Sequence, residues 1–316
     1  GSCIAVLFGS FAKGAETASA YLAAADLHAR NGDHRRAGIA LLHAAGARYA
    51  RLADWRGAAD LAAWARQELE EVEAPEFAAF AMRLQGAALD QLSDASGTEA
   101  KDRQGLTTKA RRLLTEAARQ FAALGLHYEA GYALNYRGVS FLNAGDRARA
   151  RADFQQALGL FRTARDKPAQ ALSLQSLALL SHEDGRLTDA VREFDQALTL
   201  IPRGREPESY AHTLHNSALP LRVLGHFDEA IARYYEASQI LHQLGDRAGE
   251  ARALHGLGTT LRHVGEPERA KELLRAAIEL RGKTGAKHEQ AISLIVLGEI
   301  EREDGNDDIA IALHTK

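Results

Sequence analysis

The chain has 316 residues, of which 46% are apolar, 6% aromatic and 26% charged, and its formal net charge at pH 7 is −3. This charge excludes a general attraction to nucleic acid or to an anionic membrane, and no apolar run approaches the roughly 18 residues that span a bilayer. The single cysteine, Cys3, excludes an internal disulfide framework and favours a reducing, cytoplasmic compartment.

Residues 1–33 are predicted to form an N-terminal cap or the remnant of a truncated preceding unit, with one helix near residues 16–31. The segment Val6–Gly14 (VLFGSFAKG) has the glycine–serine pattern of nucleotidyltransferases. That chemistry requires two carboxylates about ten residues further on to hold Mg²⁺, and only Asp26 is present there. A phosphate-binding P-loop is excluded because alanine follows the second glycine where lysine is required. We therefore interpret the segment as helical and expect no cofactor.

Residues 34–126 contain two less regular helical units. In the first, residues 41–65, apolar and small residues recur at spacings of three and four, which is typical of amphipathic helices. In the second, a helix over Met82–Leu92 is predicted to pair with a helix over Leu106–Phe121. The stretch between them, Ser93–Gly105, is polar, so we predict a long exposed loop within this hairpin.

Residues 127–316 consist of units that recur every 40 residues, the last of them truncated. Four sets of residues share this interval: the leucines Leu134, Leu174, Leu214, Leu254 and Leu294; the small residues Gly138, Ala178, Ala218, Gly258 and Gly298; the glycines Gly145, Gly185, Gly225, Gly265 and Gly305; and the alanines Ala150, Ala190, Ala230, Ala270 and Ala310. Four sets in register identify a repeat protein.

Each unit has the pattern of two amphipathic helices. Leu254, Leu257 and Leu261 share one helix face at about 100° per residue, Gly265 ends that helix, and a second apolar stripe begins at Ala270. A short connection folds the two helices into an antiparallel hairpin. Only the next hairpin can cover the apolar face of each one, so we predict an all-α solenoid of about fourteen helices and no sheet.

The pattern resembles the tetratricopeptide repeat, which has a small residue midway in its first helix, a glycine at the turn, and an aromatic residue between two alanines in its second helix. The matching residues are Gly138, Phe141, Gly145, Ala150, Phe154 and Ala157, then Ala178, Gly185, Ala190, Phe194, Ala197 and Pro202. The 40-residue period is similar to the long-helix repeats of the LGN/Pins and kinesin light chain families and of bacterial signalling proteins. This resemblance covers residues 34–316 and implies a right-handed superhelix that serves as an interaction surface.

Two groups of residues suggest chemistry but do not complete a site. His212 and His215 lie one turn apart, and His255 is expected on the neighbouring first helix, so three imidazoles could bind zinc. No cysteine or well-placed carboxylate completes that set, and we interpret these histidines as polar groove lining. In Ser181–Asp184, residues adjacent on a helix do not face one another, so they cannot form a catalytic triad. We predict neither an enzyme nor a metal site.

A set of polar residues lies beside the apolar stripe of the first helices, on the flank that lines the concave groove in the families that the chain resembles. The set is Tyr132, Asn135, Gln175, His182, His212, His215, Asn216, Arg222, Arg252, His255, Arg262 and Arg302. Within it, His182, Arg222, Arg262 and Arg302 recur every 40 residues and are predicted to form a basic column. We call the whole set the predicted groove residues.

The functional prediction is a non-enzymatic interaction module, the sensor or scaffold part of a larger bacterial regulatory protein. A basic column in a groove would suit an acidic or phosphorylated segment of a partner protein. Three alternatives remain: the column is a solvated helix face, the array serves self-association or autoinhibition of an attached effector enzyme, or it binds nucleic acid. The last is disfavoured by the net charge and by the few aromatic residues available for base stacking. No membrane partner is expected.

Overall fold

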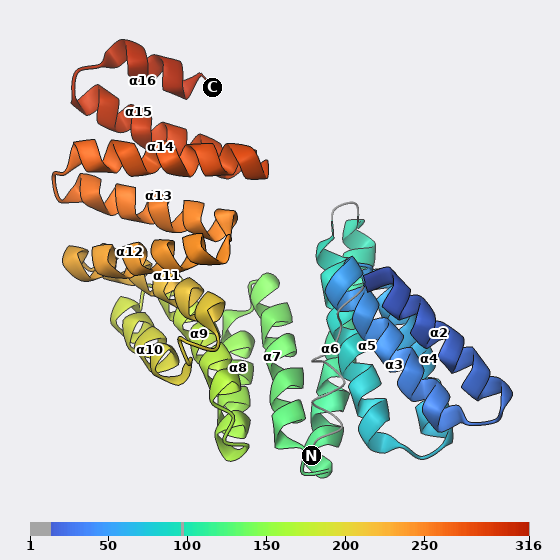
Figure 1. Ribbon diagram of the computed structural model, residues 1–316. Helices are drawn as coiled ribbons and strands as arrows, with labels where there is room; N and C mark the ends of the chain where they lie inside the picture. The colour runs from blue at the N-terminus through green and yellow to red at the C-terminus, as the bar shows by residue number, and fades with distance from the viewer. Residues whose placement is uncertain (1–13, 96–97, 316) are drawn as a thin grey trace. The chain divides into compact units, whose positions relative to one another are not determined.

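The computed structural model describes residues 14–95 and 98–315. These residues form fifteen α-helices and no strand (Figure 1), which confirms the all-α prediction. Within the described ranges, no helix is both long and apolar enough to cross a bilayer. Of the segment with the glycine–serine pattern, Val6–Lys13 lies outside the described residues, and Gly14 begins the first helix, α2.

The chain divides into two compact units, Gly1–Asp166 and Lys167–Lys316. The helices of unit 1 are α2 (Gly14–Arg30), α3 (His34–Leu52), α4 (Trp55–Glu71), α5 (Pro75–Asp94), α6 (Ala100–Ala123), α7 (His127–Asn143) and α8 (Arg147–Thr163). The helices of unit 2 are α9 (Lys167–Glu183), α10 (Leu187–Leu200), α11 (Pro207–Val223), α12 (Phe227–Leu244), α13 (Arg247–His263), α14 (Pro267–Thr284), α15 (Lys287–Glu303) and α16 (Asp307–His314).

Each unit is a stack of helix pairs, since each helix packs against its neighbours in sequence. Helices α3, α5 and α7 are the first members of the pairs in unit 1, and α9, α11, α13 and α15 are the first members in unit 2. First helices of consecutive pairs also contact one another, as α3 does with α5 and α11 with α13. The first helices of a unit therefore share one face, and the predicted groove residues lie on these helices.

The five turn glycines end the first helices of the regular pairs. Gly145, Gly185, Gly225, Gly265 and Gly305 have φ angles of 77°, 74°, 83°, 81° and 80°. Glycine adopts this left-handed conformation without the steric penalty of a side chain. At the first turn, the Gly145 N–H donates to the Leu142 carbonyl (2.8 Å) and the Asp146 N–H to the Phe141 carbonyl (2.9 Å), which satisfies carbonyls at the end of α7. The glycine interval is thus the interval between helix ends.

The small residues of the first helices make room for large residues of the second helices. A Cβ atom built on Gly138 in α7 would lie 2.7 Å from Cε1 of the Phe154 ring in α8. A Cβ on Gly258 in α13 would lie 3.0 Å from Cγ of Leu274 in α14. Phe154 and Leu274 are fully buried. Each small residue therefore lets the larger partner fill the interior of its pair at close packing.

The predicted long loop over Ser93–Gly105 is wrong. Helix α5 continues to Asp94 and α6 begins at Ala100, so the connection comprises only residues 95–99, of which 96 and 97 lie outside the described residues. Ser93 is buried, and its hydroxyl donates to the Asp90 carbonyl (2.7 Å). Residues 101–105 form an exposed extension of α6. Such a helical end has no apolar face to bury, so its sequence carries no helical periodicity.

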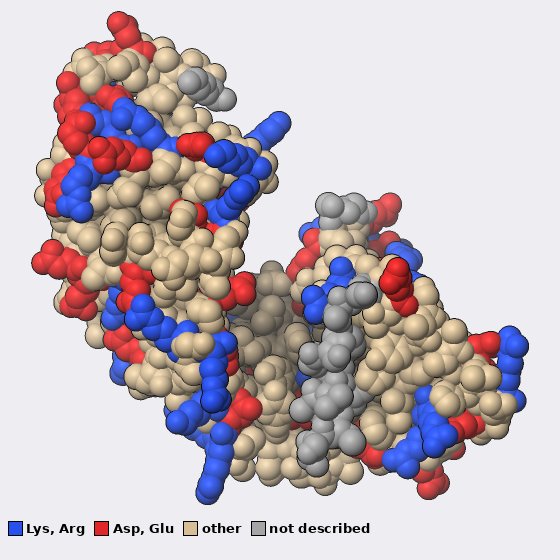
Figure 2. Space-filling model, in the orientation of Figure 1, with Lys and Arg blue, Asp and Glu red and all other residues tan. Residues whose placement is uncertain are grey.

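The last pair of unit 2 is joined to the preceding pair by ion pairs. Figure 2 shows basic and acidic side chains intermixed over α14–α16, at the top of the view. Lys271 Nζ on α14 lies 2.8 Å from Asp304 Oδ2, and Arg275 Nη2 lies 2.9 Å from Oε1 of Glu301 on α15. Both Lys271 and Glu301 are buried, with side chains 7% and 4% exposed. These groups form a buried charge cluster between α14 and α15.

Candidate functional site

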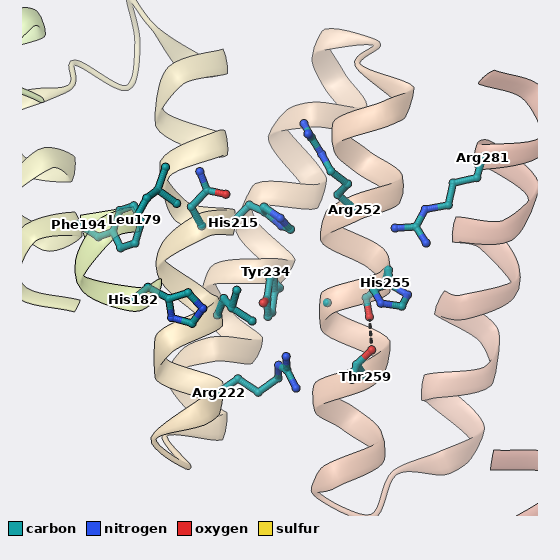
Figure 3. Close-up of a pocket in the computed structure, with 13 residues that line it drawn as sticks. Leu179, His182, Phe194, His215, Arg222, Tyr234, Arg252, His255, Thr259 and Arg281 are labelled. Atoms are coloured by element: carbon teal, nitrogen blue, oxygen red, sulfur yellow. Dashed lines mark hydrogen bonds between the residues drawn. The ribbon is translucent and has the colours of Figure 1, made fainter. Parts of the chain in front are cut away.

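Unit 2 contains a cavity of about 270 Å³ (Figure 3). It is lined by Leu179, His182, Phe194, His215, Asn216, Leu219, Arg222, Tyr234, Arg252, His255, Gly256, Thr259 and Arg281. The predicted groove residues among these are His182, His215, Asn216, Arg222, Arg252 and His255. The structure therefore brings half of the predicted groove residues to one place, which we call the unit 2 cavity.

Helical spacing on α11 and α13 directs the polar side chains into the unit 2 cavity. His215, Leu219 and Arg222 follow one another on α11 at intervals of four and three residues, so they share one helix face. His255 and Thr259 are one turn apart on α13, and the Thr259 hydroxyl donates to the His255 carbonyl (2.8 Å). Because α11 and α13 are consecutive first helices, these faces lie side by side and form the walls of the cavity.

Tyr234 of α12 reaches the cavity from the second-helix layer. A Cβ on Gly256 would lie 2.5 Å from Cε1 of the tyrosine, so glycine at this position of α13 provides the space for the ring. The centroids of the Tyr234 and His215 rings are 5.4 Å apart. In Figure 3, the imidazoles of His182, His215 and His255 surround this ring. The cavity is thus lined by the Tyr234 ring and by three imidazoles.

The charges that line the unit 2 cavity are all positive. Arg222, Arg252 and Arg281 line it, and no carboxylate does. Within the described part of the chain, none of these three guanidiniums forms an ion pair with a carboxylate. Arg281 is buried; its Nη1 donates to the Glu289 carbonyl (2.5 Å) and to the Ser293 hydroxyl, both neutral acceptors. The cavity is therefore suited to an anion.

Three buried nitrogen atoms at the cavity have no hydrogen-bond partner among the described residues. They are Nδ1 of His182, Nδ1 of His215 and Nε of Arg222. Burying a donor or acceptor without a partner costs about 1–3 kcal/mol, so such atoms are uncommon and favour binding of a group that supplies the partner. Their grouping at one cavity distinguishes this part of unit 2 from an ordinary solvated helix face.

Burial lowers the pKa of two cavity histidines to about 4. For His215 the cause is first desolvation and then the positive charges of Arg252, His212, His255 and Arg281. For His255 it is desolvation, followed by the charges of Arg281 and Arg222. Burial also lowers the pKa of His182. His215 and His255 are therefore neutral at pH 7, and one ring nitrogen of each can donate a hydrogen bond.

The stability of unit 2 is expected to fall between pH 6.5 and pH 4. In this interval the unfolded chain, with an ordinary histidine pKa of 6.5, binds more protons at His215 and His255 than the folded chain does. Acidification therefore favours unfolding, and the effect vanishes above pH 6.5. Calorimetric melting between pH 7 and pH 5 should show a smaller decrease for the double variant His215→Gln, His255→Gln than for the unaltered chain. Histidine Cε1–H resonances that titrate near 6.5 for both residues would contradict this expectation.

The three histidines considered for zinc are placed unfavourably for a cation. The described residues contain no group of three His, Cys, Asp or Glu side chains arranged to hold a metal. Arg252 and Arg281 lie close enough to His215 to lower its pKa, and they would repel a metal ion there. His212 instead lies 3.3 Å from Asp246 Oδ2 through its Nε2. These contacts favour an anion at this place.

Beyond Arg222, the basic column is not a continuous row of unpaired positive charges. The guanidinium of Arg262 forms ion pairs with Glu299 and Glu303, which lie one turn apart on α15. Hydrogen bonds from Arg262 also lower the pKa of Glu303. The expectation that Arg262 adds an uncompensated charge is therefore wrong, because carboxylates of the next first helix neutralise it. Arg302 is exposed and does not line the unit 2 cavity.

The remaining predicted groove residues lie outside the unit 2 cavity. Gln175 on α9 donates through Nε2 to the Thr213 hydroxyl on α11 (2.5 Å) and so links two first helices. Tyr132 and Asn135 lie on α7 in unit 1. Asn135 is buried, and its Oδ1 accepts no hydrogen bond from residues 14–95 or 98–315, while the Tyr132 ring packs edge-to-face on Phe161 at 5.1 Å.

Arg281 is the cavity residue that sequence reasoning most clearly missed. It lies on α14, a second helix, where the groove was not expected. The equivalent positions of the preceding units are occupied by Phe161, Ile201 and Leu241, all of which are buried. An arginine in a register position that is otherwise apolar is a signal that could have been read from the repeats. Its long side chain extends from the buried layer to the cavity wall.

The comparisons with known proteins agree with this architecture. The family model of the tetratricopeptide repeat matches residues 209–283, which include most of the cavity lining. No curated protein sequence matches significantly. Among solved structures, BtubC (BKLC) from P. vanneervenii is similar at a TM-score of 0.60 and 18% identity, over 73% of this chain and 91% of that one. The apo form of RapI is similar at a TM-score of 0.65 and 12% identity, over 94% of this chain and 78% of that one.

A signal transduction ATPase with numerous domains from Pyrococcus horikoshii, whose sensor is a tetratricopeptide repeat, is similar at a TM-score of 0.63 and 13% identity. The match covers 95% of this chain and 48% of that one, so the chain spans about half of that protein. These likenesses concern the fold. The matched family model shows tetratricopeptide repeats over residues 209–283, and the recurring helix pairs and glycine turns give the rest of the described chain the same fold.

Proposed function

We propose that the chain is a non-enzymatic interaction module that holds an acidic segment of a partner protein in the unit 2 cavity. The observation that carries this proposal is the convergence of Arg222, Arg252 and Arg281 on a cavity without a lining carboxylate. A cluster of arginine side chains is a recurrent means of binding acidic motifs. The match of residues 209–283 to the tetratricopeptide repeat, a repeat that commonly binds peptides, supports it.

The module is proposed to act as the sensor or scaffold part of a larger bacterial regulatory protein. The similarity to a multidomain signalling ATPase with a sensor of the same repeat type supports this role. In such an arrangement the bound segment would bias the repeat array, and the effector would respond to its occupancy.

The test uses random linear peptides displayed on phage, which are selected on the whole chain and then labelled and titrated. The double variant Arg222→Glu, Arg252→Glu is expected to weaken binding by at least about 100-fold, because hydrogen bonds to charged groups contribute about 1.5–3 kcal/mol each. Binding to the unaltered chain should also weaken as salt increases. Arg262 is left in place, because a glutamate there would face Glu299 and Glu303 and disturb the contact between α13 and α15.

The matched control is Arg192→Glu, Arg269→Glu, which reverses two exposed charges on the second helices α10 and α14. It should bind the selected peptides as the unaltered chain does. Equal binding by the cavity variant and by the control, with unchanged circular dichroism spectra, would overturn the proposal and make the cavity arginines a solvated surface feature.

A further inference from the structure

The positive charge of the unit 2 cavity exceeds what a single carboxylate compensates. Arg222, Arg252 and Arg281 each carry one charge at neutral pH, and His215 and His255 are neutral. A carboxylate contributes one negative charge, whereas a phosphate monoester contributes about 1.5 to 2 at pH 7. Arg281 is buried, Arg222 is half-buried and Arg252 is exposed. Because uncompensated charge is unfavourable where it is withdrawn from water, a dianion matches these guanidiniums better than a single carboxylate does.

The unpartnered nitrogens favour a ligand with many acceptor atoms. Nδ1 of His182, Nδ1 of His215 and Nε of Arg222 are buried at the cavity and have no hydrogen-bond partner in the part of the chain that the structure describes. His182 lies on α9, and His215 and Arg222 lie on α11, so the three nitrogen atoms reach the cavity from two adjacent first helices. A single ligand atom cannot accept hydrogen bonds from all three. A phosphate monoester presents three terminal oxygens in a tetrahedral arrangement, and a carboxylate presents two in a plane. The tetrahedral phosphate can therefore accept hydrogen bonds from side chains of α9 and α11 at once.

The size and the apolar part of the lining determine what carries the phosphate. Pockets for drug-sized ligands occupy roughly 300–1,000 Å³, and this cavity, at about 270 Å³, is smaller. It therefore suits one side chain better than a nucleotide. Leu179, Phe194 and Leu219 form an apolar wall beside the nitrogen-bearing groups, which suits the stem of that side chain.

From these features we infer that the unit 2 cavity anchors a phosphorylated side chain of the partner protein, with the phosphate between the arginines and its stem on the apolar wall. This inference rests on the proposed peptide-binding function and names the group that is recognised. It makes unit 2 a reader of phosphorylation, so that a kinase acting on the partner would control occupancy of the module.

The test compares phenyl phosphate with phenylacetate and inorganic phosphate by calorimetric titration of the whole chain. Phenyl phosphate is expected to bind one site at least about tenfold more tightly than phenylacetate, because it makes more charge-assisted hydrogen bonds. It should also exceed inorganic phosphate, which cannot use the apolar wall, and it should shift the His215 and His182 Cε1–H resonances. Arg222→Gln should weaken it by about tenfold, while Arg269→Gln on the exposed face of α14 should not.

The outcomes separate this inference from the proposed function. If phenyl phosphate binds no better than phenylacetate while selected peptides still depend on Arg222 and Arg252, the phosphate inference is overturned and the acidic-segment module stands. Phenyl phosphate binding that Arg222→Gln leaves unchanged would also overturn it, by placing the ligand elsewhere. If neither peptides nor phenyl phosphate respond to the cavity variants, both proposals are overturned.

Discussion

Replacing Phe154 by alanine is expected to lower the free energy of unfolding of unit 1 by about 3–5 kcal/mol, the usual loss for a large buried aromatic side chain. The ring is fully buried and fills the space that Gly138 leaves between α7 and α8. Removing it leaves a cavity that the small residue on the facing helix cannot fill. Denaturant unfolding followed by tryptophan fluorescence measures the effect in unit 1, because both tryptophans, Trp55 and Trp64, lie there.

Two further variants make this expectation specific. Leu124→Ala removes a side chain that is 42% exposed, and it should change stability far less. Leu274→Ala makes the equivalent change in unit 2, where Leu274 packs against Gly258, and should lower its calorimetric melting temperature. Similar curves for Phe154→Ala and Leu124→Ala would show that the aromatic position of the repeat is not a packing position in this chain.

Replacing Glu301 by alanine is expected to loosen the contact of α15 and α16 with α14. The Glu301 carboxylate is buried, accepts from Arg275 and from the Asn306 amide (2.8 Å), and lies 3.9 Å from Lys271 Nζ. Removing one partner of a buried ion pair typically costs about 3–5 kcal/mol. Here the cost should be smaller, because Lys271 keeps ion pairs with Asp304 and Glu268 and the Arg275 side chain is exposed. Hydrogen exchange should therefore accelerate in α15 and α16 before it accelerates in α11–α13.

A neutral and an exposed substitution provide the comparison. Glu301→Gln keeps acceptor capacity toward Arg275 and should restore part of the protection that alanine removes. Glu279→Ala breaks an exposed i, i+4 pair with Lys283 on α14, and it should leave exchange in α15 unchanged. Equal exchange in the Glu301→Ala and Glu279→Ala variants would mean that apolar packing alone holds the last pair in place.

The repeat architecture could be predicted from local signals. The turn glycines mark positions where the chain needs a positive φ angle, and the small and aromatic positions mark contacts within one helix pair. Such signals depend on a few neighbouring residues, and repetition every 40 residues makes them unambiguous. The exception is the beginning of α6, where residues 101–105 are helical but exposed, so no apolar periodicity identified them.

The groove could be predicted only in part. His215, Arg222 and His255 line one cavity, because their direction follows from their position on a first helix; that this face binds a partner stays a prediction. Whether a charged side chain on that face already forms an ion pair depends on residues of other helix pairs. Arg262 forms ion pairs with Glu299 and Glu303 of α15, whereas Arg222 forms none with the described residues, although the two arginines occupy the same register position.

Helix boundaries, pairing and the apolar faces thus follow from the amino-acid sequence of this chain, because backbone conformation and close packing are decided over short distances along the chain and repeat with it. The positive lining of the unit 2 cavity, on which the proposed anion binding rests, is decided by the tertiary structure. It requires Arg281 from a second helix, Arg222 from α11 and Arg252 from α13 to meet at one cavity whose lining contains no carboxylate. Electrostatic compensation acts through space between side chains of different repeats, so the register of the repeats alone does not reveal it.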